Sequence, residues 1–183
     1  TRYAVNSWGI FFLEAEKGYT TVEASSIVAV NAIAGIFGTF FSGLISDWFY
    51  DGRRNLLALL FGIIYAVAAA VFFWGPQDAL IDSVAMGFFG VALGVLMVYL
   101  GGLMAVDICS KEVSGTVLGV VGVASYLGAG FQDIISGQLI EDSKVIVDGV
   151  AVYNFDAAIY LWVGAAVVSF VLATLVWNVR SPD

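Results

Sequence analysis

Long stretches without any charged side chain constrain this chain more than any other feature of its sequence. The five longest are 24–46, 55–77, 83–106, 113–132 and 157–179. The hydrocarbon core of a bilayer is about 30 Å thick and an α-helix rises about 1.5 Å per residue, so about 20 apolar residues cross it. Since 61% of the residues are hydrophobic and 12% are charged, the sequence predicts an all-α membrane protein.

A sixth apolar stretch, 3–13, is shorter and begins almost at the first residue of the chain. We interpret it as part of a transmembrane helix, although an interfacial helix of this length is an alternative. The fourth stretch continues past Asp133 to Ile140, which would place a carboxylate inside the membrane. The predicted spans within the single bundle 1–183 are about 1–16, 24–49, 55–76, 80–108, 113–140 and 155–179.

The composition excludes several classes of function. With 15 acidic and 7 basic residues, the net charge of -8 opposes binding to nucleic acid, which needs a basic surface. The chain has no histidine and one cysteine, so it offers neither a zinc-type ligand cluster nor a serine or cysteine triad with histidine. We therefore predict no enzyme, no cofactor, no metal site and no nucleic-acid partner.

The basic residues predict the orientation in the membrane. If all six spans cross, one side carries four of them and the other side two. The first side carries Arg53, Arg54, Lys111 and Arg180, and the second carries Lys17 and Lys144. Because cytoplasmic loops carry the excess of lysine and arginine, the side with four is predicted to be cytoplasmic. The predicted location is the inner (plasma) membrane.

Two parts of the chain resemble each other at a distance of three spans. Residues 37–47 align with 131–141, with phenylalanine, serine and glycine at matching positions and an acid at the end of each. An odd number of spans inverts the second copy, and inverted three-span repeats build many secondary transporters. The alternative is that glycine-rich helices resemble each other by composition alone.

The end of the second predicted span and the short loop after it carry a compact motif that consists of Gly43, Asp47, Gly52, Arg53 and Arg54. Gly43 permits close helix contact, Asp47 at the helix end can pair with a base, and Gly52 supports a turn. Such a motif can act as a cytoplasmic gate, stabilising one state of a transporter. It resembles the loop motif of the major facilitator superfamily, with a slightly longer spacer. Alternatively, the two arginines only set the orientation.

Further stretches resemble the organophosphate:phosphate antiporter family, which includes glycerol-phosphate and hexose-phosphate transporters and a hexose-phosphate sensor. The resemblance extends from the first residue to about 142, and its motifs lie at 1–3, 8–18, 34–39, 102–107 and 111–128. It implies the C-terminal six-helix half of a twelve-helix fold, built as 3+3 inverted repeats, with the first helix truncated and an N-terminal half as partner.

The resemblance also implies a function. The expected activity is secondary transport in the lipid bilayer, exchanging a phosphorylated small metabolite, such as a sugar phosphate or glycerol phosphate, for inorganic phosphate by alternating access. The alternative is a membrane sensor that binds a sugar phosphate and signals without net transport.

Three substrate-binding candidates follow from the resemblance and from helix geometry. The family's phosphate-binding arginine matches Arg2, and a guanidinium grips phosphate oxygens through two hydrogen bonds. A flanking arginine that snorkels to the interface is the alternative. Tyr126 matches a tyrosine that faces the family's cavity, or it is a packed aromatic. Asn6, four residues after Arg2, shares its helix face.

The chain departs from the family at several charged positions. Ala32 and Ser7 stand where many members carry an acid, while Asp133, beside Gln132, stands where better-known members have a small residue. An intramembrane carboxylate is a functional candidate. We interpret Asp133 as a coupling residue, either a proton carrier or the counter-ion of a base in the other half. The alternative is a hydrated position near the outer interface.

Overall fold

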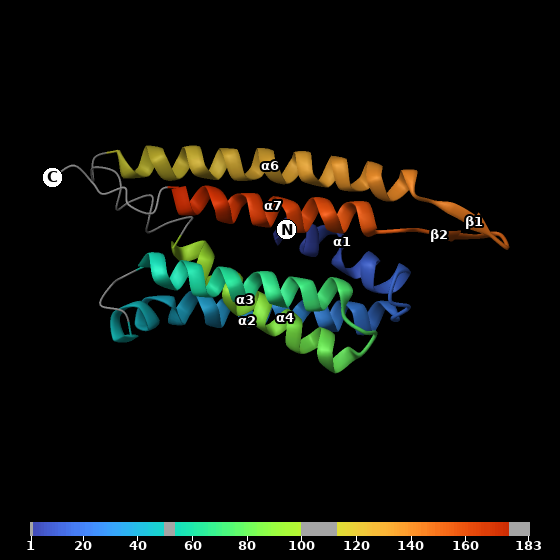
Figure 1. Ribbon diagram of the computed structural model, residues 1–183, viewed down its shortest axis with the longest axis horizontal. Coiled ribbons are helices and arrows are strands. Elements are labelled where there is room, and N and C mark those ends of the chain that lie inside the picture. Colours follow the sequence, from blue (N-terminus) through green and yellow to red (C-terminus); the bar gives the residue numbers. More distant parts are fainter. Residues whose placement is uncertain (1, 50–53, 100–112, 176–183) are drawn as a thin grey trace.

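The computed structural model describes residues 2–49, 54–99 and 113–175, with helices and strands numbered as in Figure 1. The elements in these residues are α1 (Arg2–Ala15), α2 (Thr21–Phe49), α3 (Arg54–Trp74), α4 (Ala79–Val98), α6 (Ser114–Asp142), β1 (Val145–Val147), β2 (Val150–Val152) and α7 (Asp156–Leu175). The predicted fold class, a bundle of membrane helices, is confirmed. The end of the predicted span 80–108 and the end of the predicted span 155–179 lie outside the described residues.

Four of the described helices are long and apolar enough to cross a bilayer: α2, α3, α4 and α6. The apolar part of α7, Asp156–Leu172, falls just short of that length, and α1 has 14 residues. The described part of α1 would cover about two thirds of a bilayer core, at about 1.5 Å per residue.

The helices lie side by side along one direction (Figure 1). One layer contains α6 and α7, the other contains α2, α3 and α4, and α1 lies between them near the end that carries the β-hairpin. We call this the hairpin end. Tyr3 of α1 contacts Tyr126 of α6, and Ser7 of α1 contacts Asp133 of α6. Residue numbers therefore increase in the same direction along the two helices, so α1 and α6 run parallel. Three helices long and apolar enough to span, α2, α3 and α4, lie between them in the chain, and an odd number of intervening crossings gives this direction.

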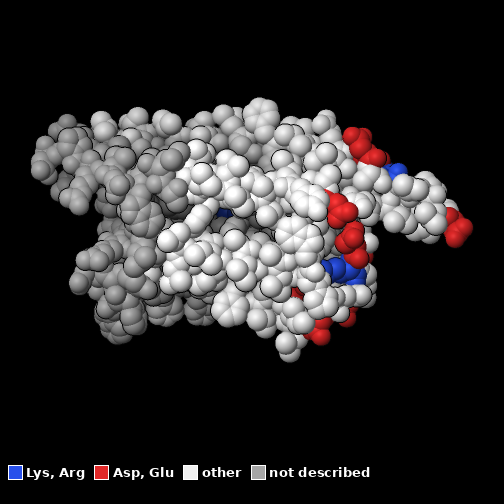
Figure 2. Space-filling model, in the orientation of Figure 1, with Lys and Arg blue, Asp and Glu red and all other residues white. Residues whose placement is uncertain are grey.

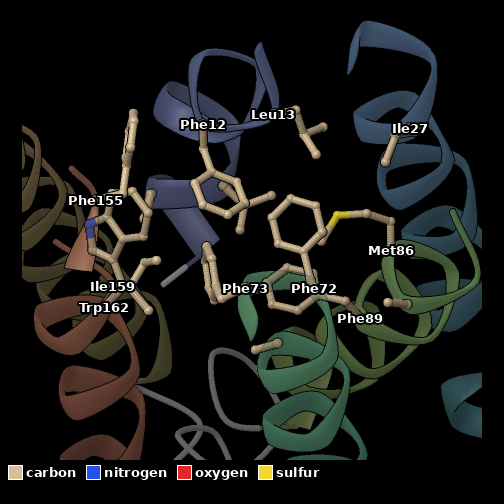
Figure 3. Packing of buried hydrophobic residues seen from close by; sticks show 14 of the residues in the cluster. Phe12, Leu13, Ile27, Phe72, Phe73, Met86, Phe89, Phe155, Ile159 and Trp162 are labelled. Atoms are coloured by element: carbon tan, nitrogen blue, oxygen red, sulfur yellow. The ribbon is translucent and has the colours of Figure 1, made fainter. Parts of the chain in front are cut away.

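The core that joins the two layers is aromatic and lies around Phe12 of α1 (Figure 3). Its ring centroid lies 5.5 Å from that of Phe72, 5.4 Å from that of Phe73 and 5.5 Å from that of Phe155. Edge-to-face and tilted contacts of this kind are favourable for aromatic rings. Since Phe12 contacts both α3 and the start of α7, α1 holds the two layers together.

Small residues let α2 and α4 approach closely. A Cβ atom at Gly38 would lie 2.2 Å from the carbonyl oxygen of Val91, and one at Gly94 would lie 2.3 Å from that of Gly35. In lipid, helices associate through close packing because no hydrophobic force drives them together. The glycines therefore bring the backbones of α2 and α4 into direct contact.

The connection between α6 and α7 contains a β-hairpin that the all-α prediction did not include. Val145 pairs with Val152 and Val147 with Val150, in antiparallel register. The two-residue turn is Asp148–Gly149, both with positive φ (51° and 81°). An Asp-Gly pair between short β-branched runs is a strong hairpin signal because both turn positions need positive φ. A search for apolar spans alone does not detect it.

Candidate functional site

Charged side chains gather at the hairpin end of the molecule (Figure 2). Among the side chains that the structure describes, two charged ones lie elsewhere. They are Arg2, at the start of α1, and Asp133, within α6. These two residues therefore mark a candidate polar site between the ends of the described bundle, where the surrounding helices are apolar.

Arg2 lies level with the middle of α6. The Tyr3 ring centroid lies 6.3 Å from that of Tyr126, and the guanidinium carbon of Arg2 lies 5.0 Å from the Tyr3 ring centroid. Tyr126 is twelve residues from Ser114 and sixteen from Asp142, or about 18 and about 24 Å along the helix. Arg2 is thus far from either end of the neighbouring span.

The other two substrate-binding candidates point away from the core of the bundle. Asn6 is exposed, and Tyr126 is exposed over 73% of its surface. The Tyr126 side chain contacts the Tyr3 ring and is not packed into the described helices, which disfavours the interpretation of Tyr126 as a packed aromatic. Arg2, Asn6 and Tyr126 therefore lie around the α1–α6 contact with polar atoms on an open face.

Asp133 is held by side chains from two helices. The Ser7 hydroxyl of α1 donates to Oδ2 of Asp133 at 3.2 Å, and Nε2 of Gln132 lies 3.4 Å from Oδ1. Gln132 also donates to the Ser136 hydroxyl at 3.0 Å, and the Trp162 indole of α7 donates to the same oxygen at 2.7 Å. We call Ser7, Gln132, Asp133, Ser136 and Trp162 the Asp133 bracket. It connects α1, α6 and α7 through polar contacts.

The depth of Asp133 can be estimated from the length of its helix. With 29 residues, α6 is about 43 Å long against a hydrocarbon core of about 30 Å. Asp133 lies nine residues before Asp142, about 14 Å from that end. If α6 is centred, this carboxylate lies about 7 Å inside the core. That depth disfavours a hydrated position at the interface.

The predicted cytoplasmic gate motif lies at the edge of the described residues. Gly43 is within α2 and a Cβ there would meet no atom within 4 Å. Asp47 is in the last turn of α2 and Arg54 begins α3. Gly52 and Arg53 lie outside the described residues. The interpretation of this motif as a latch therefore stays a prediction.

A buried ion pair at the hairpin end was missed by the sequence reasoning, which treated Lys17 as a loop charge. Nζ of Lys17 lies 2.6 Å from Oδ1 of Asp82, and their side chains are 6% and 0% exposed. The Tyr19 hydroxyl donates to Oδ2 of Asp82 at 2.9 Å. Burial, followed by this hydrogen bond and the nearby carboxylates, raises the pKa of Tyr19 to about 12. The signal available in the sequence was an acid at the start of an apolar run.

Two cavities in the described bundle are unsuited to phosphate. One of about 410 Å³ lies between α3 and α7, beside Gly62 and Phe170, and one of about 420 Å³ lies between α3 and α4, beside Val67 and Phe88. Their linings contain no charged side chain, so neither can compensate an anion. Within the described residues no group of three metal-ligating side chains occurs either.

The major facilitator superfamily model matches residues 1–132 of the chain, and these residues include the predicted gate motif and most of α6. The chain therefore belongs to the major facilitator superfamily. Its curated relatives include glycerol-phosphate and hexose-phosphate transporters, as in the organophosphate:phosphate antiporter family that the motifs resemble. The predicted family is confirmed.

Three relatives illustrate this similarity. A glycerol-3-phosphate transporter of Bacillus subtilis is 28% identical over 182 residues, 97% of this chain and 38% of that protein. A probable hexose phosphate transport protein of Chlamydia muridarum is 31% identical over 147 residues, 77% of this chain and 31% of that protein. The membrane sensor protein UhpC of Escherichia coli is 30% identical over 131 residues, 70% of this chain and 29% of that protein.

No solved structure matches the chain significantly. The chain spans less than two fifths of the length of these curated relatives. It therefore corresponds to part of the longer fold of these relatives, and the family and the apolar helices identify an integral membrane protein.

Proposed function

We propose that the full-length protein is a secondary transporter that exchanges a phosphorylated small metabolite, a sugar phosphate or glycerol phosphate, for inorganic phosphate by alternating access. One observation carries this proposal: Arg2 lies level with the middle of a membrane-spanning helix, beside the exposed Tyr126. An arginine at membrane depth costs at least about 2.5–3.5 kcal/mol and such residues generally serve a function.

Arg2 binds the phosphate group in this proposal. The guanidinium offers two parallel hydrogen bonds to phosphate oxygens, and it stays charged at any physiological pH. The Tyr126 hydroxyl donates to the phosphate or to a hydroxyl of the organic group, and the Asn6 amide lines the cavity one turn from Arg2. The three side chains leave the rest of the anion to be bound by groups on the opposite wall.

The opposite wall is provided by the other six helices of the whole protein. Within the described bundle, Ser136 and Ile140 are the fully buried residues of α6, so most of this helix is available for contact with other segments or lipid. Since secondary transporters bind substrate at the interface of their two halves near the midplane, the open face with Arg2 and Tyr126 is the surface that faces the other half.

Asp133 is the coupling candidate, as a proton carrier or as the counter-ion of a base in the other half. Gly43, Asp47, Gly52, Arg53 and Arg54 form the cytoplasmic gate motif. The loops with Arg53 and Arg54, with Lys111, and the C-terminus are on the cytoplasmic side of the inner membrane, by the excess of basic residues. Transport by rearrangement of the two halves needs no catalytic residue and no cofactor.

The test is counterflow in proteoliposomes with the full-length protein. Vesicles are loaded with inorganic phosphate. Labelled glycerol phosphate, triose phosphate, hexose phosphate and carboxylated phosphates are offered outside, and labelled neutral sugars are offered as the comparison. We expect at least one phosphorylated compound to accumulate only in vesicles that contain phosphate. If no compound exchanges but neutral sugars accumulate, the proposed substrate class is wrong.

A sensor that binds a sugar phosphate without net transport is the second candidate. It is favoured by the similarity to the membrane sensor protein UhpC, which extends over 70% of this chain. The same vesicles separate the two. Saturable binding of a hexose phosphate together with no counterflow would support the sensor, and counterflow would support the transporter.

A further inference from the structure

The Asp133 bracket includes four side chains that the proposed function does not use. Ser7 is the member from α1, the helix that carries Arg2, and its hydroxyl lies 3.2 Å from Oδ2 of Asp133. The carboxylate therefore lies at the contact between two helices, within hydrogen-bond distance of the short side chain of Ser7. Either position can in principle supply the acid.

The other members of the bracket fix the carboxylate from the opposite side. Oδ1 of Asp133 faces the Gln132 amide, which also donates to Ser136. Ser136 is fully buried and accepts a hydrogen bond from Trp162, whose surface is 1% exposed. The chain of hydrogen bonds therefore runs from a buried anchor, Ser136 with Trp162, through the partly buried Gln132 and Asp133 to the exposed Ser7. Linked hydrogen bonds of this kind restrict the positions of their members. The bracket thus holds the carboxylate at one place between α1 and α6.

The packing around the bracket keeps α1 close to α6. A Cβ atom at Gly137, four residues after Asp133, would lie 3.3 Å from the ring of Trp8, the neighbour of Ser7. Tyr3, one turn before Ser7, contacts Tyr126. The position of Ser7 relative to Asp133 is therefore fixed by ring contacts on both sides of the hydrogen bond.

We infer that Ser7 and Asp133 form a single carboxylate site shared by α1 and α6, in which the place of the negative charge matters and the helix that supplies it does not. Ser7 is a positioning residue, since it acts through Asp133. The inference deepens the proposed function and rests on it, because it locates the coupling carboxylate against the helix of Arg2.

The test transposes the acid in full-length protein. Asp133→Ser removes the carboxylate, Ser7→Asp with Asp133→Ser moves it to α1, and Ser7→Asn with Asp133→Ser is the neutral matched control. We expect phosphate exchange to fall about tenfold in Asp133→Ser, to recover to within about threefold of the parent in the transposed variant, and not to recover in the neutral control. Equal activity of the transposed and neutral variants would overturn the inference.

If Asp133→Ser does not fold, a measurement of protein stability replaces the transport assay. Membrane abundance and melting temperature are then compared between the transposed and neutral variants. Recovery with aspartate alone supports the shared site, and equal recovery with asparagine contradicts it.

A cross-link tests the geometry without any transport assay. In a Cys109→Ser background, cysteines at 7 and 133 are expected to form a disulfide on mild oxidation, whereas cysteines at 7 and 134 are not, because residue 134 lies on another face of α6. No cross-link between 7 and 133 contradicts the shared site. If the parent protein exchanges no phosphorylated compound while this cross-link forms, the proposed function fails and the geometry of the site stands.

Discussion

At the scale of single residues, the ion pair between Lys17 and Asp82 is a buried polar contact whose loss should destabilise the fold. Both side chains are buried, and Nζ of Lys17 also lies 5.4 Å from the Phe72 ring centroid. Removing one partner leaves an uncompensated buried charge, which costs about 3–5 kcal/mol. We expect Lys17→Met to lower the free energy of unfolding by about this amount, measured by thermal denaturation in detergent.

The control for this prediction replaces both partners. Lys17→Met with Asp82→Leu leaves no buried charge, so the double variant should be more stable than Lys17→Met alone. A double variant as unstable as the single one would show that the ion pair itself is not the source of the effect.

Glu16, in the loop after α1, provides a prediction about pH. Burial, and then the charge of Asp156, raise the pKa of Glu16, while a backbone hydrogen bond from Phe155 partly opposes them. A raised carboxyl pKa favours the protonated form in the folded state, so this residue's contribution to stability is lost as the pH rises through that pKa. We expect Glu16→Gln to raise the melting temperature at neutral pH and to have no effect in acid.

The matched control is Glu14→Gln, two residues earlier, in the last turn of α1. It removes the same charge without the contact to Phe155, so its effect on the melting temperature should be smaller at neutral pH. If both variants change the melting temperature equally at neutral pH, the environment of Glu16 is not the cause of the effect.

Arg2, Asn6 and Tyr126 could be chosen from the sequence because helix spacing and family motifs depend only on nearby residues. The partner of Asp133 could not, since Ser7 and Asp133 are 126 positions apart in the chain. Lys17 and Asp82 were hidden for the same reason: a loop lysine and an acid at a helix start become a buried pair only when the segment between α1 and α2 folds against the start of α4.

At the scale of helices and strands, the glycines between α2 and α4 are the most sensitive positions. A Cβ at Gly38 would collide with the backbone of Val91, which cannot move without moving α4. We expect Gly38→Ala to destabilise the bundle by about 1–3 kcal/mol, as overpacking generally does, measured by thermal denaturation in detergent.

Gly164 of α7 is the matched control, because a Cβ there would meet no atom within 4 Å. Gly164→Ala should be neutral or stabilising, since alanine is the better helix former by about 1 kcal/mol. Equal destabilisation by both variants would contradict the close contact of α2 with α4.

The helices of the bundle were predictable because length and absence of charge are one-dimensional properties that a bilayer imposes on any span. The β-hairpin depends on turn chemistry at Asp148 and Gly149, which a hydrophobicity pattern does not detect. How the helices pair depends on which small residues face each other, and Gly38 opposite Val91 follows from the packing alone.

At the scale of the whole molecule, our proposal makes the described bundle one wall of a binding site. Charged side chains gather at its hairpin end, the aromatic core lies around Phe12, and Tyr126, beside α1, is exposed. A wall of this kind binds an anion only in combination with a second one, so the account applies to the full-length protein.

The central claim is that Arg2 grips a phosphate at mid-span through both arms of its guanidinium, and Arg2→Lys tests it most directly. Lysine keeps the positive charge but loses the bidentate geometry. In reconstituted full-length protein, we predict that exchange of labelled phosphate falls at least about tenfold, while Lys144→Arg, at the hairpin end, exchanges at the parental rate. Exchange by Arg2→Lys at the parental rate would contradict the account.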